Sequence, residues 1–467
     1  MHLFDKEIYS NRRDKLRKEV KSGLMLFLGN QEASFNYPDN TYAFRQDSNF
    51  LYFFGLDLYN LVGVLDIDAN QDYIFGNDVD MDDIIWMGPQ DSINDLATKV
   101  AVSHTDTLDN LQTFLKEAIT AGRPIHFVPT YRGEHQLQLA ELLGIKTSVT
   151  NDYASQELIK AIVKIREIKE DVEIVEIEKA VGIAYEMHTT SMRMAAKPGR
   201  IEREIAGTIE GISLAKGGPV SFPIILSVHG ETLHNHHHDN IIEVGRMMIT
   251  DAGAETTMHY ASDITRSVPV GGKFNERQKG IYQAVLNANV EAIKAIKPDV
   301  EYRSIHFLAA KELVKGLIKV GLMKGDAQAA VDAEAHTLFQ PHGLGHMMGL
   351  DVHDMEGLGE NNVGYDENTK RSSNFGTAFL RLGKKLKPGF VLTVEPGCYF
   401  IPALIDQWKA ENKHQEFINY ELLETYKDFG GIRIEDDILV TKEGQRVLGK
   451  PIPKTIEEIE AMMANPL

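Results

Sequence analysis

Cysteine and long apolar runs are almost absent from this sequence. Cys398 is the single cysteine of 467 residues, so no intrachain disulfide can form. No segment approaches the roughly 20 apolar residues that cross a bilayer, and the charged start lacks the apolar run of a signal peptide. We therefore expect a cytoplasmic protein.

Positive charge is also scarce, because 49 Lys and Arg face 68 Asp and Glu, for a formal net charge of −19. Lys and Arg drive binding to nucleic-acid phosphates and to anionic membranes. The composition therefore argues against nucleic acid and membrane as partners.

The length predicts two or three domains. Before about residue 150, helix-like stretches interleave with apolar runs that predict strands, which indicates an α/β domain. The runs are LMLFLG, FLYFFGL, NLVGVLDID, DYIFG and IHFVP. From about Lys160 a long charged helix is expected, with Ile165, Ile168, Val172 and Val175 on one face. We predict domains at 1–160 and 161–467.

The second domain is expected to be α+β. A helix should end at Gly217-Gly218, followed by strands over 220–270, helices over 275–322, strands again from about 337 and a strand pair near 390–440. The stretch 402–428 leaves room for a long loop.

Two segments share one pattern, Gly245-RMMIT-Asp251-Ala-Gly and Gly389-FVLTV-Glu395-Pro-Gly. Each is followed by a further acid beside an isoleucine, Asp263 after 12 positions and Glu435 after 40. Chance could produce one such segment, but the shared frame predicts two related halves that deliver two acids each to a common centre.

Four clustered carboxylates would repel one another unless a cation held them. Carboxylates with an imidazole suit Mn²⁺, Co²⁺ or Zn²⁺, and this number of acids suits two ions. The imidazole is expected from the glycine-rich segment that contains His342, His346 and His353. Purely structural histidines are the alternative there.

A second histidine tract, His234-Asn-His236-His237-His238, precedes the first half. A site role is expected for His234, whereas His237 and His238 suit a solvated or metal-scavenging loop equally well.

Four ordered motifs, TDAGAETTMHYASDITRSVPV, HGLGHMMGLDVHD, LKPGFVLTVEPGCYF and GGIRIEDDILVT, resemble the pita-bread metallopeptidases, specifically the aminopeptidase P and prolidase branch. TYAFRQDSNFLYFFGL resembles the N-terminal domain of that branch. The resemblance implies a creatinase/aminopeptidase P-type N-terminal α/β domain and a pita-bread α+β catalytic domain with an internal pseudo-two-fold repeat.

The resemblance also implies a two-manganese centre, with Co²⁺ or Zn²⁺ as alternatives. Asp263 and Glu435 would bridge both ions, Asp251 would complete one, and His346 and Glu395 the other. His353 and His234 would bind the scissile carbonyl, and Glu395 is our choice for the proton shuttle. His342 and Arg433 would lie just outside, and His236 could replace His234.

The implied activity is hydrolysis of the Xaa-Pro bond at peptide N-termini, as in aminopeptidase P, with prolidase action on Xaa-Pro dipeptides as the alternative. A homodimer or homotetramer is also implied. A catalytically inactive binding protein and a metal-free creatinase-like hydrolase are disfavoured, because all five ligand positions carry competent side chains. The 12-residue spacing of the first acid pair exceeds the family's by one, so the turn at 256–259 is expected to be reshaped.

Overall fold

A computed structural model describes residues 2–467 of the chain. It contains two compact units. The first runs to Arg166 and includes Met355–Asn362, and the second comprises Glu167–Asp354 and Val363–Leu467. The boundary expected at 160 stays a prediction. No helix among residues 2–467 combines the length and the apolar character of a membrane span.

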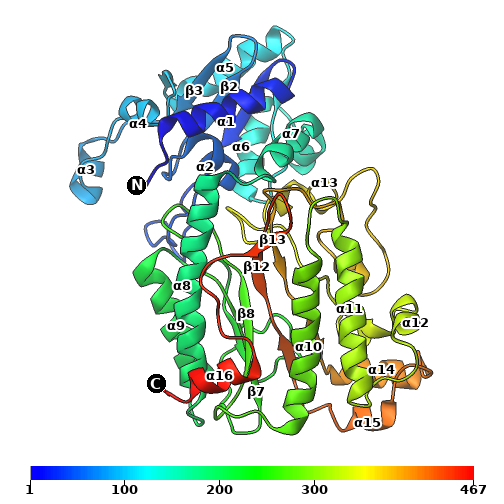
Figure 1. The fold of residues 1–467 in the computed structure, drawn as a ribbon. Coiled ribbons are helices and arrows are strands. Elements are labelled where there is room, and N and C mark those ends of the chain that lie inside the picture. The colour runs from blue at the N-terminus through cyan, green and yellow to red at the C-terminus, as the bar shows by residue number, and fades with distance from the viewer. Residues whose placement is uncertain (1) are drawn as a thin grey trace. The chain divides into compact units, whose positions relative to one another are not determined.

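The first unit is built on a mixed five-stranded sheet of order β4-β3-β2-β1-β5 (Figure 1). β1 and β3 pair antiparallel with β2, whereas the outer strands β4 and β5 pair parallel with their neighbours. The strands are β1 (Leu24–Leu28), β2 (Val62–Asp66), β3 (Gln71–Phe75), β4 (His104–Asp106) and β5 (Ile125–His126).

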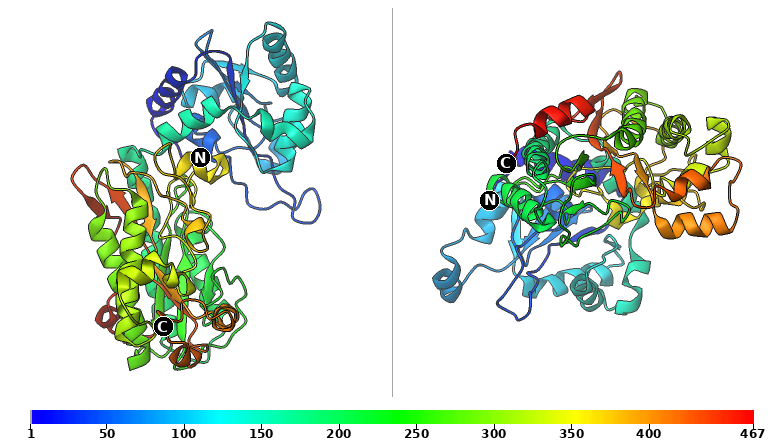
Figure 2. Two further views of the ribbon diagram at one scale, coloured as in Figure 1. Left: turned by 90° about the vertical axis from the view of Figure 1, so that its right-hand side faces the viewer. Right: turned by 90° about the horizontal axis from the view of Figure 1, so that it is seen from below.

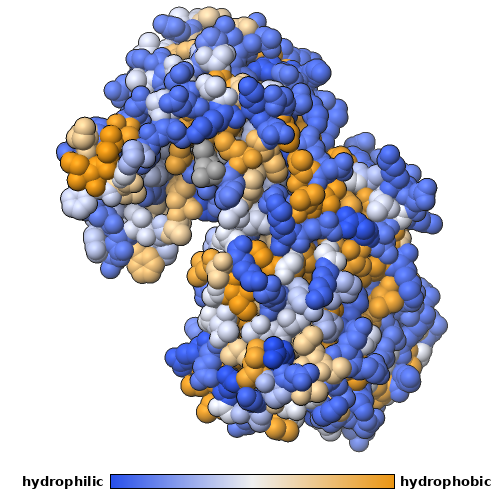
Figure 3. All heavy atoms as spheres, turned by 60° about the vertical axis from the view of Figure 1, so that its left-hand side comes forward, coloured by the Kyte–Doolittle hydropathy of each residue, from blue (hydrophilic) through white to orange (hydrophobic). Residues whose placement is uncertain are grey.

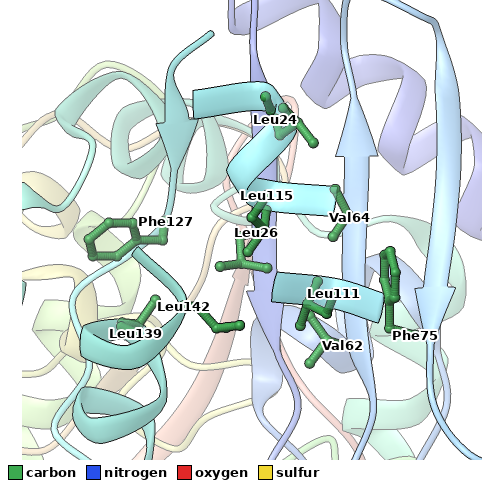
Figure 4. Packing of buried hydrophobic residues seen from close by; sticks show 11 residues of the cluster. Leu24, Leu26, Val62, Val64, Phe75, Leu111, Leu115, Phe127, Leu139 and Leu142 are labelled. Atoms are coloured by element: carbon green, nitrogen blue, oxygen red, sulfur yellow. The ribbon is translucent and has the colours of Figure 1, made fainter. Parts of the chain in front are cut away.

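Helices α5 (Leu108–Thr120) and α6 (Gly133–Leu143) supply the core that covers one face of this sheet. Figure 4 shows Leu111 and Leu115 directed at side chains of β1 to β3. The predicted α/β architecture is therefore confirmed. The other helices of the unit are α1 (Lys6–Glu19), α2 (Ser48–Phe54), α3 (Met81–Met87), α4 (Ile93–Lys99) and α7 (Gln156–Arg166).

One predicted strand is wrong, because FLYFFGL forms the helix α2. The Asp47 side chain accepts hydrogen bonds from the backbone N–H groups of Asn49 and Phe50, which caps the helix start. Gly55, at φ 70°, ends it in a left-handed conformation. All seven residues of α2 are buried, so the run has no polar face whose period would distinguish helix from strand.

Three small sheets form the centre of the second unit, of orders β6-β7-β8, β13-β12-β9 and β10-β11. Their strands are β6 (Ile225–Ser227), β7 (Met247–Ala252), β8 (Ile264–Pro269), β9 (Val391–Val394), β10 (Gly397–Tyr399), β11 (Gly431–Arg433), β12 (Asp436–Val440) and β13 (Gln445–Val447).

Long helices cover these sheets in two pairs (Figures 1 and 2). α8 (Asp171–Ala195) contacts β7 and β8 and packs beside α9 (Glu202–Lys216), whereas α10 (Glu276–Ala295) contacts β9, β10 and β11 and packs beside α11 (Tyr302–Lys319). Each half of the predicted repeat thus has its own helix pair. Shorter helices are α12 (Ala327–Asp332), α13 (Glu360–Val363), α14 (Pro402–Ala410), α15 (Tyr420–Glu424) and α16 (Ile456–Met463).

The long helix predicted from Lys160 is wrong, because it is split between α7 and α8. Glu170 forms a capping box with Glu173, which starts α8 anew. Glu167 pairs with Lys384 at 2.7 Å, and Lys169 pairs with Asp354 at 2.9 Å. These ion pairs fix the interruption, which leaves Ile168 and Val175 36% and 52% exposed rather than on a buried face.

Two further expectations about the second domain are wrong. The chain after residue 337 forms short 3₁₀ turns and irregular segments, and strands resume only at Val391. The glycines of this stretch oppose regular strands. The expected loop at 402–428 contains α14, whose first turn begins with Pro402, and α15, which is capped by Asn419.

The pseudo-repeat is present in the backbone. Gly245 and Gly389 have φ values of 94° and 90° just before β7 and β9. β7 pairs antiparallel with β8 and β9 with β12. Asp263 stands immediately before β8 and Glu435 immediately before β12, so each half places one acid at the end of its first strand and one before its second.

Gly253 lets the two acids of the first half approach each other. A Cβ at Gly253 would lie 1.8 Å from the Ser262 carbonyl oxygen. We expect Gly253→Ala to lower the free energy of unfolding by about 3 kcal/mol, the upper range for an overpacked interior. Urea denaturation would measure this loss.

Gly211→Ala is the matched control, because nothing lies within 4 Å of its would-be Cβ on α9. It should stabilise the chain by about 0.5–1 kcal/mol through helix propensity. Equal effects of the two substitutions would contradict the steric argument.

Candidate metal centre

The first two predicted acids meet through the pairing of β7 and β8. Asp251, near the end of β7, stands opposite Thr265 of β8, two residues after Asp263. Asp251 and Asp263 are both buried, at 6% and 5% exposure. Together with Glu435 they offer oxygen atoms that lie within 4.8 Å of one another.

The second half adds a histidine to its acids. His346, Glu395 and Glu435 also offer ligand atoms within 4.8 Å of one another. His346 Nε2 lies 3.3 Å from Asp263 Oδ2 and 3.8 Å from Glu395 Oε1. The structure therefore brings all five predicted ligand residues into one cluster, with Glu435 common to both groups.

Backbone contacts hold these acids in place. The Asn289 amide of α10 donates hydrogen bonds to the carbonyl oxygens of Val394 and Ile434, at 3.1 and 3.3 Å. These are the residues that precede Glu395 and Glu435. The backbone N–H of Asp263 donates to Asp437 Oδ2 at 3.0 Å. One helix and one further carboxylate thus fix three of the acids.

Arg433 connects the two halves. Its guanidinium donates to Asp251 Oδ2, to the Tyr399 hydroxyl at 2.6 Å and to Thr265 Oγ1 at 3.1 Å. The Tyr399 hydroxyl also bonds His342 Nε2 at 2.9 Å. Arg433 and His342 therefore lie beside the acid cluster and contact it through a hydrogen-bond network.

Thr265 and Tyr399 belong to this network but were missed in the sequence. The Thr265 hydroxyl donates to Glu435 Oε2 at 2.7 Å and accepts from Arg433. Thr265 lies two residues after Asp263, so the two-residue strand period could have placed it on the same face. For Tyr399 the sequence holds no comparable signal, because the bond depends on the pairing of β10 with β11.

Burial and mutual repulsion set the protonation of the acids. Burial raises the pKa of Asp263 well above its ordinary value, and Asp251, Asp437 and Glu395 raise it further. Burial likewise raises the pKa of Glu435 well above normal, with Asp263 adding to it. The pKa of Glu395 is raised by burial, although His346 and Arg433 oppose that rise.

The cluster fits divalent cations. Asp251 Oδ1 and Glu435 Oε1 are buried and have no hydrogen-bond partner among residues 2–467, and a cation would satisfy such orphaned carboxylate oxygens. The set of carboxylates with one imidazole suits hard or borderline ions.

The acids open onto a cavity of about 530 Å³. Of the predicted substrate-side residues, His234, His236, His342, His353 and Arg433 all line it. The ring of His353 lies 4.1 Å from that of His346, centroid to centroid. Apolar residues form much of the remaining wall, namely Phe222, Pro223, Ile225, Leu233, Val352 and Phe379.

Arg381 also lines the cavity and was not predicted. Its positive charge is near enough to lower the pKa of Glu395. No motif pointed to it, because it follows an irregular segment whose path only the fold defines.

The rest of the histidine tract lies apart from the cavity lining. His238 Nδ1 bonds the Leu226 carbonyl oxygen at 3.0 Å, and the His237 backbone N–H donates to Asn235 Oδ1. In the turn after Asp251, a buried hydrogen bond of 2.7 Å joins His259 Nδ1 to Glu255 Oε2, and His259 has φ 63°. That this turn is reshaped relative to the family stays a prediction.

Removing one acid tests the electrostatic argument. Without metal, Glu435→Gln should unfold at a higher temperature than the wild-type chain at pH 8, because a neutral amide replaces a repelled anion. A raised native pKa means that stability falls as pH rises through it. The advantage of the variant should therefore shrink as the pH falls towards about 4, the ordinary carboxyl pKa.

The same scans with divalent metal added are the control. With metal added, the wild-type chain should unfold at a higher temperature than Glu435→Gln, because the wild-type carboxylate then binds a cation. A metal-free variant less stable than wild type at pH 8 would contradict the repulsion.

Comparison with known proteins agrees with this geometry. Residues 175–442 match the model of "Metallopeptidase family M24", and residues 9–126 match "Aminopeptidase P, N-terminal domain". The human protein named Xaa-Pro dipeptidase is 34% identical over 97% of this chain and 91% of its own length. A protein of Leptosphaeria maculans named probable Xaa-Pro aminopeptidase is 32% identical over 94% of this chain and 75% of its own.

Solved structures give the same fold. A glutamate-to-alanine variant of Escherichia coli aminopeptidase P in complex with substrate superposes with a TM-score of 0.81 and 26% identity, over 99% of both chains. Aminopeptidase PepP of Pseudomonas aeruginosa also has a TM-score of 0.81, at 24% identity. The predicted pita-bread fold and its N-terminal domain are confirmed. The chain belongs to metallopeptidase family M24, is a hydrolase, and carries the N-terminal domain of aminopeptidase P.

Proposed function

We propose that this chain hydrolyses the Xaa-Pro bond at the N-terminus of peptides, as an Xaa-Pro aminopeptidase. The main support is the convergence of Asp251, Asp263, His346, Glu395 and Glu435 at the floor of a cavity with apolar walls. The names of the related proteins support proline as the second residue of the substrate.

We propose two divalent ions, Mn²⁺ first, with Co²⁺ or Zn²⁺ as alternatives. Asp251, Asp263 and Glu435 would hold one ion, and His346, Glu395 and Glu435 the other. These are two of the three groups of close ligand atoms, and the third joins Asp263 and His346 to His353. Asp263 would also bridge, since its Oδ2 lies 3.3 Å from His346 Nε2. Bound ions of this kind make water nucleophilic near neutral pH and polarise a carbonyl.

The chain's own residues move the proton and hold the carbonyl. Glu395 would accept the proton of the attacking water and return it to the leaving proline nitrogen. His353 and His234 would donate hydrogen bonds to the oxygen on which negative charge develops. His342 and Arg433 would hold Tyr399 and Asp251 in position.

The second candidate is a dipeptidase that cleaves Xaa-Pro itself, and Arg381 is the observation that favours it. The proline ring would lie against the apolar wall. In a dipeptide the proline carries the free carboxylate, and a guanidinium in the same cavity suits a carboxylate.

Assembly, domain division and location are part of the proposal. We place the domain boundary near 160, between the two stretches matched by the family models, and the protein in the cytoplasm. We propose a homodimer or homotetramer, because α3 exposes Met81, Ile85, Trp86 and Met87 by 62–84%. Figure 3 shows apolar residues among hydrophilic ones on one face of the molecule.

Two substitutions test the metal centre. Glu395→Gln and His346→Ala should each lower kcat by at least about 100-fold, the usual contribution of a proton shuttle or more, while the urea midpoint shows a folded chain. His237→Ala is the matched control and should keep activity, because His237 is exposed and outside the cavity lining. Full activity of either variant after metal is restored would overturn the assignment.

Product analysis separates the two candidates. The Mn²⁺-loaded protein is offered an Xaa-Pro dipeptide, its C-terminal amide and an Xaa-Pro-Pro tripeptide. Release of the first residue from the tripeptide is expected for an aminopeptidase, and cleavage of the free dipeptide alone would identify a dipeptidase. Cleavage of no substrate, with metal bound, would reject the proposed substrate class.

Arg381→Met tests the carboxylate contact. If Arg381 binds the free proline carboxylate, KM for the dipeptide should rise about 10–100-fold, as for the loss of a charged hydrogen bond. KM for the C-terminal amide of the dipeptide should change little, because the amide carries no negative charge. Equal changes for both substrates would show that Arg381 does not bind the carboxylate.

A further inference from the structure

Two buried histidines stand outside the catalytic cavity. His306 of α11 and His336 of the 3₁₀ turn Ala335–Leu338 have ring centroids 6.3 Å apart and planes inclined by 60°. Their exposure is 1% and 0%. None of the four ring nitrogens has a hydrogen-bond partner among residues 2–467. Unpaired buried polar groups are costly and rare, so these nitrogens indicate a ligand.

Two further unpartnered groups lie on adjoining segments. The backbone N–H of Gln340 donates to the His336 carbonyl oxygen, one turn along the chain. Neither polar atom of the Gln340 side chain, nor the Thr377 hydroxyl, has a partner in the described part of the chain. The Thr377 segment packs here, since a Cβ on the preceding Gly376 would lie 2.6 Å from Thr337 Cγ2. Gln340 and Thr377 are buried, at 1% and 3% exposure.

The chemistry of the four side chains selects the ligand. None of them is a permanent cation that would balance an anion. Two imidazoles without a carboxylate or thiolate also fall short of the three or four protein ligands of a typical zinc site. Burial lowers the pKa of His306 to about 4 and that of His336 to about 3, so both rings are neutral at pH 7. Each neutral ring offers one donor and one acceptor, and the amide and the hydroxyl each offer both. A ligand that donates and accepts equally well is water.

The distance between the two histidine rings also favours water over a metal ion. A water about 2.8 Å from one nitrogen of each ring, at a tetrahedral angle, sets the ring centroids about 6.4 Å apart. A tetrahedral metal ion about 2.0–2.1 Å from each nitrogen would set them about 5.2 Å apart. The separation of 6.3 Å matches the water bridge.

We propose that His306, His336, Gln340 and Thr377 form a buried water-binding site, and that the water held there positions the segment leading to His342. Gln340 lies two residues before His342. The same segment bonds Tyr399 twice, through the Phe339 carbonyl oxygen and through His342 Nε2. Tyr399 in turn accepts from Arg433 at 2.6 Å, so a displaced segment would disturb the network around Asp251.

Urea denaturation of the metal-loaded full chain tests the site, because a bound water and a dry site predict midpoint shifts of opposite sign when a histidine is replaced. His306→Leu and His336→Leu should each lower the urea midpoint, because each leaves the bound water short of a partner. The urea midpoint of the double variant should fall by less than the sum of the two single decreases, because both residues bind the same water. If the site is dry, leucine removes an unsatisfied polar group and the midpoint rises, which would overturn the proposal.

His126→Leu is the matched control in another buried location. Its ring nitrogens have protein partners, Ser155 Oγ at 2.8 Å and the Ser22 carbonyl oxygen at 3.0 Å, so its loss should destabilise in either case. If a leucine variant fails to fold, a high-resolution crystal structure of the wild type decides. Water density bonded to both rings supports the proposal, whereas no density or an anomalous metal peak overturns it.

Kinetics test the positioning role, which rests on the proposed function. Gln340→Met, similar in volume, should lower kcat for an Xaa-Pro substrate about tenfold, as outer-shell changes do, with KM and bound metal unchanged. Gln328→Met is the matched control on α12, where the exposed Gln328 amide donates to Asp332 Oδ1 at 2.8 Å, and it should change neither constant. Unchanged kcat in Gln340→Met would overturn the positioning role. Inactivity of the wild type would reject the proposed function and leave the midpoint result intact.

Discussion

Repulsion between buried carboxylates is the constraint on which the second unit depends. Asp263, Glu395 and Glu435 all have raised pKa values because burial disfavours their charged forms. The fold nevertheless holds them together with one helix amide, one cross-strand arginine and the Asp437 carboxylate. Such a cluster favours cations in the folded state alone, so metal binding and folding are coupled.

Each of the two halves of the second unit positions two of the four acids. Each places an acid at the end of one strand and another before its antiparallel partner. Arg433 and Thr265 join the halves, because Arg433 donates to Asp251 and to Thr265, while Thr265 donates to Glu435. The centre is therefore a property of the interface between the halves.

The sequence predicted those features that depend on local pattern. The shared frame of Gly245–Gly253 and Gly389–Gly397 located the acids, since glycine positions and strand period are visible in the residues themselves. Prediction from the sequence failed for the helix α2, because burial on all sides hides the helical period of its residues. It also failed at Glu167 and Lys169, where ion pairs with distant residues interrupt a helix. Tyr399 and Arg381 could not be predicted from the sequence, because only the tertiary fold brings them to the metal centre and its cavity.

The bond between Arg433 and Asp251 spans 182 residues. At about 5–20 residues per second, a ribosome needs roughly 10–35 s to travel that far. Throughout that interval the emerging chain lacks Glu435 and the arginine that joins the halves, although it already holds Asp251. An incomplete chain thus has the first acids but no assembled centre, and hydrolytic capacity arises only when synthesis of the second half is nearly over.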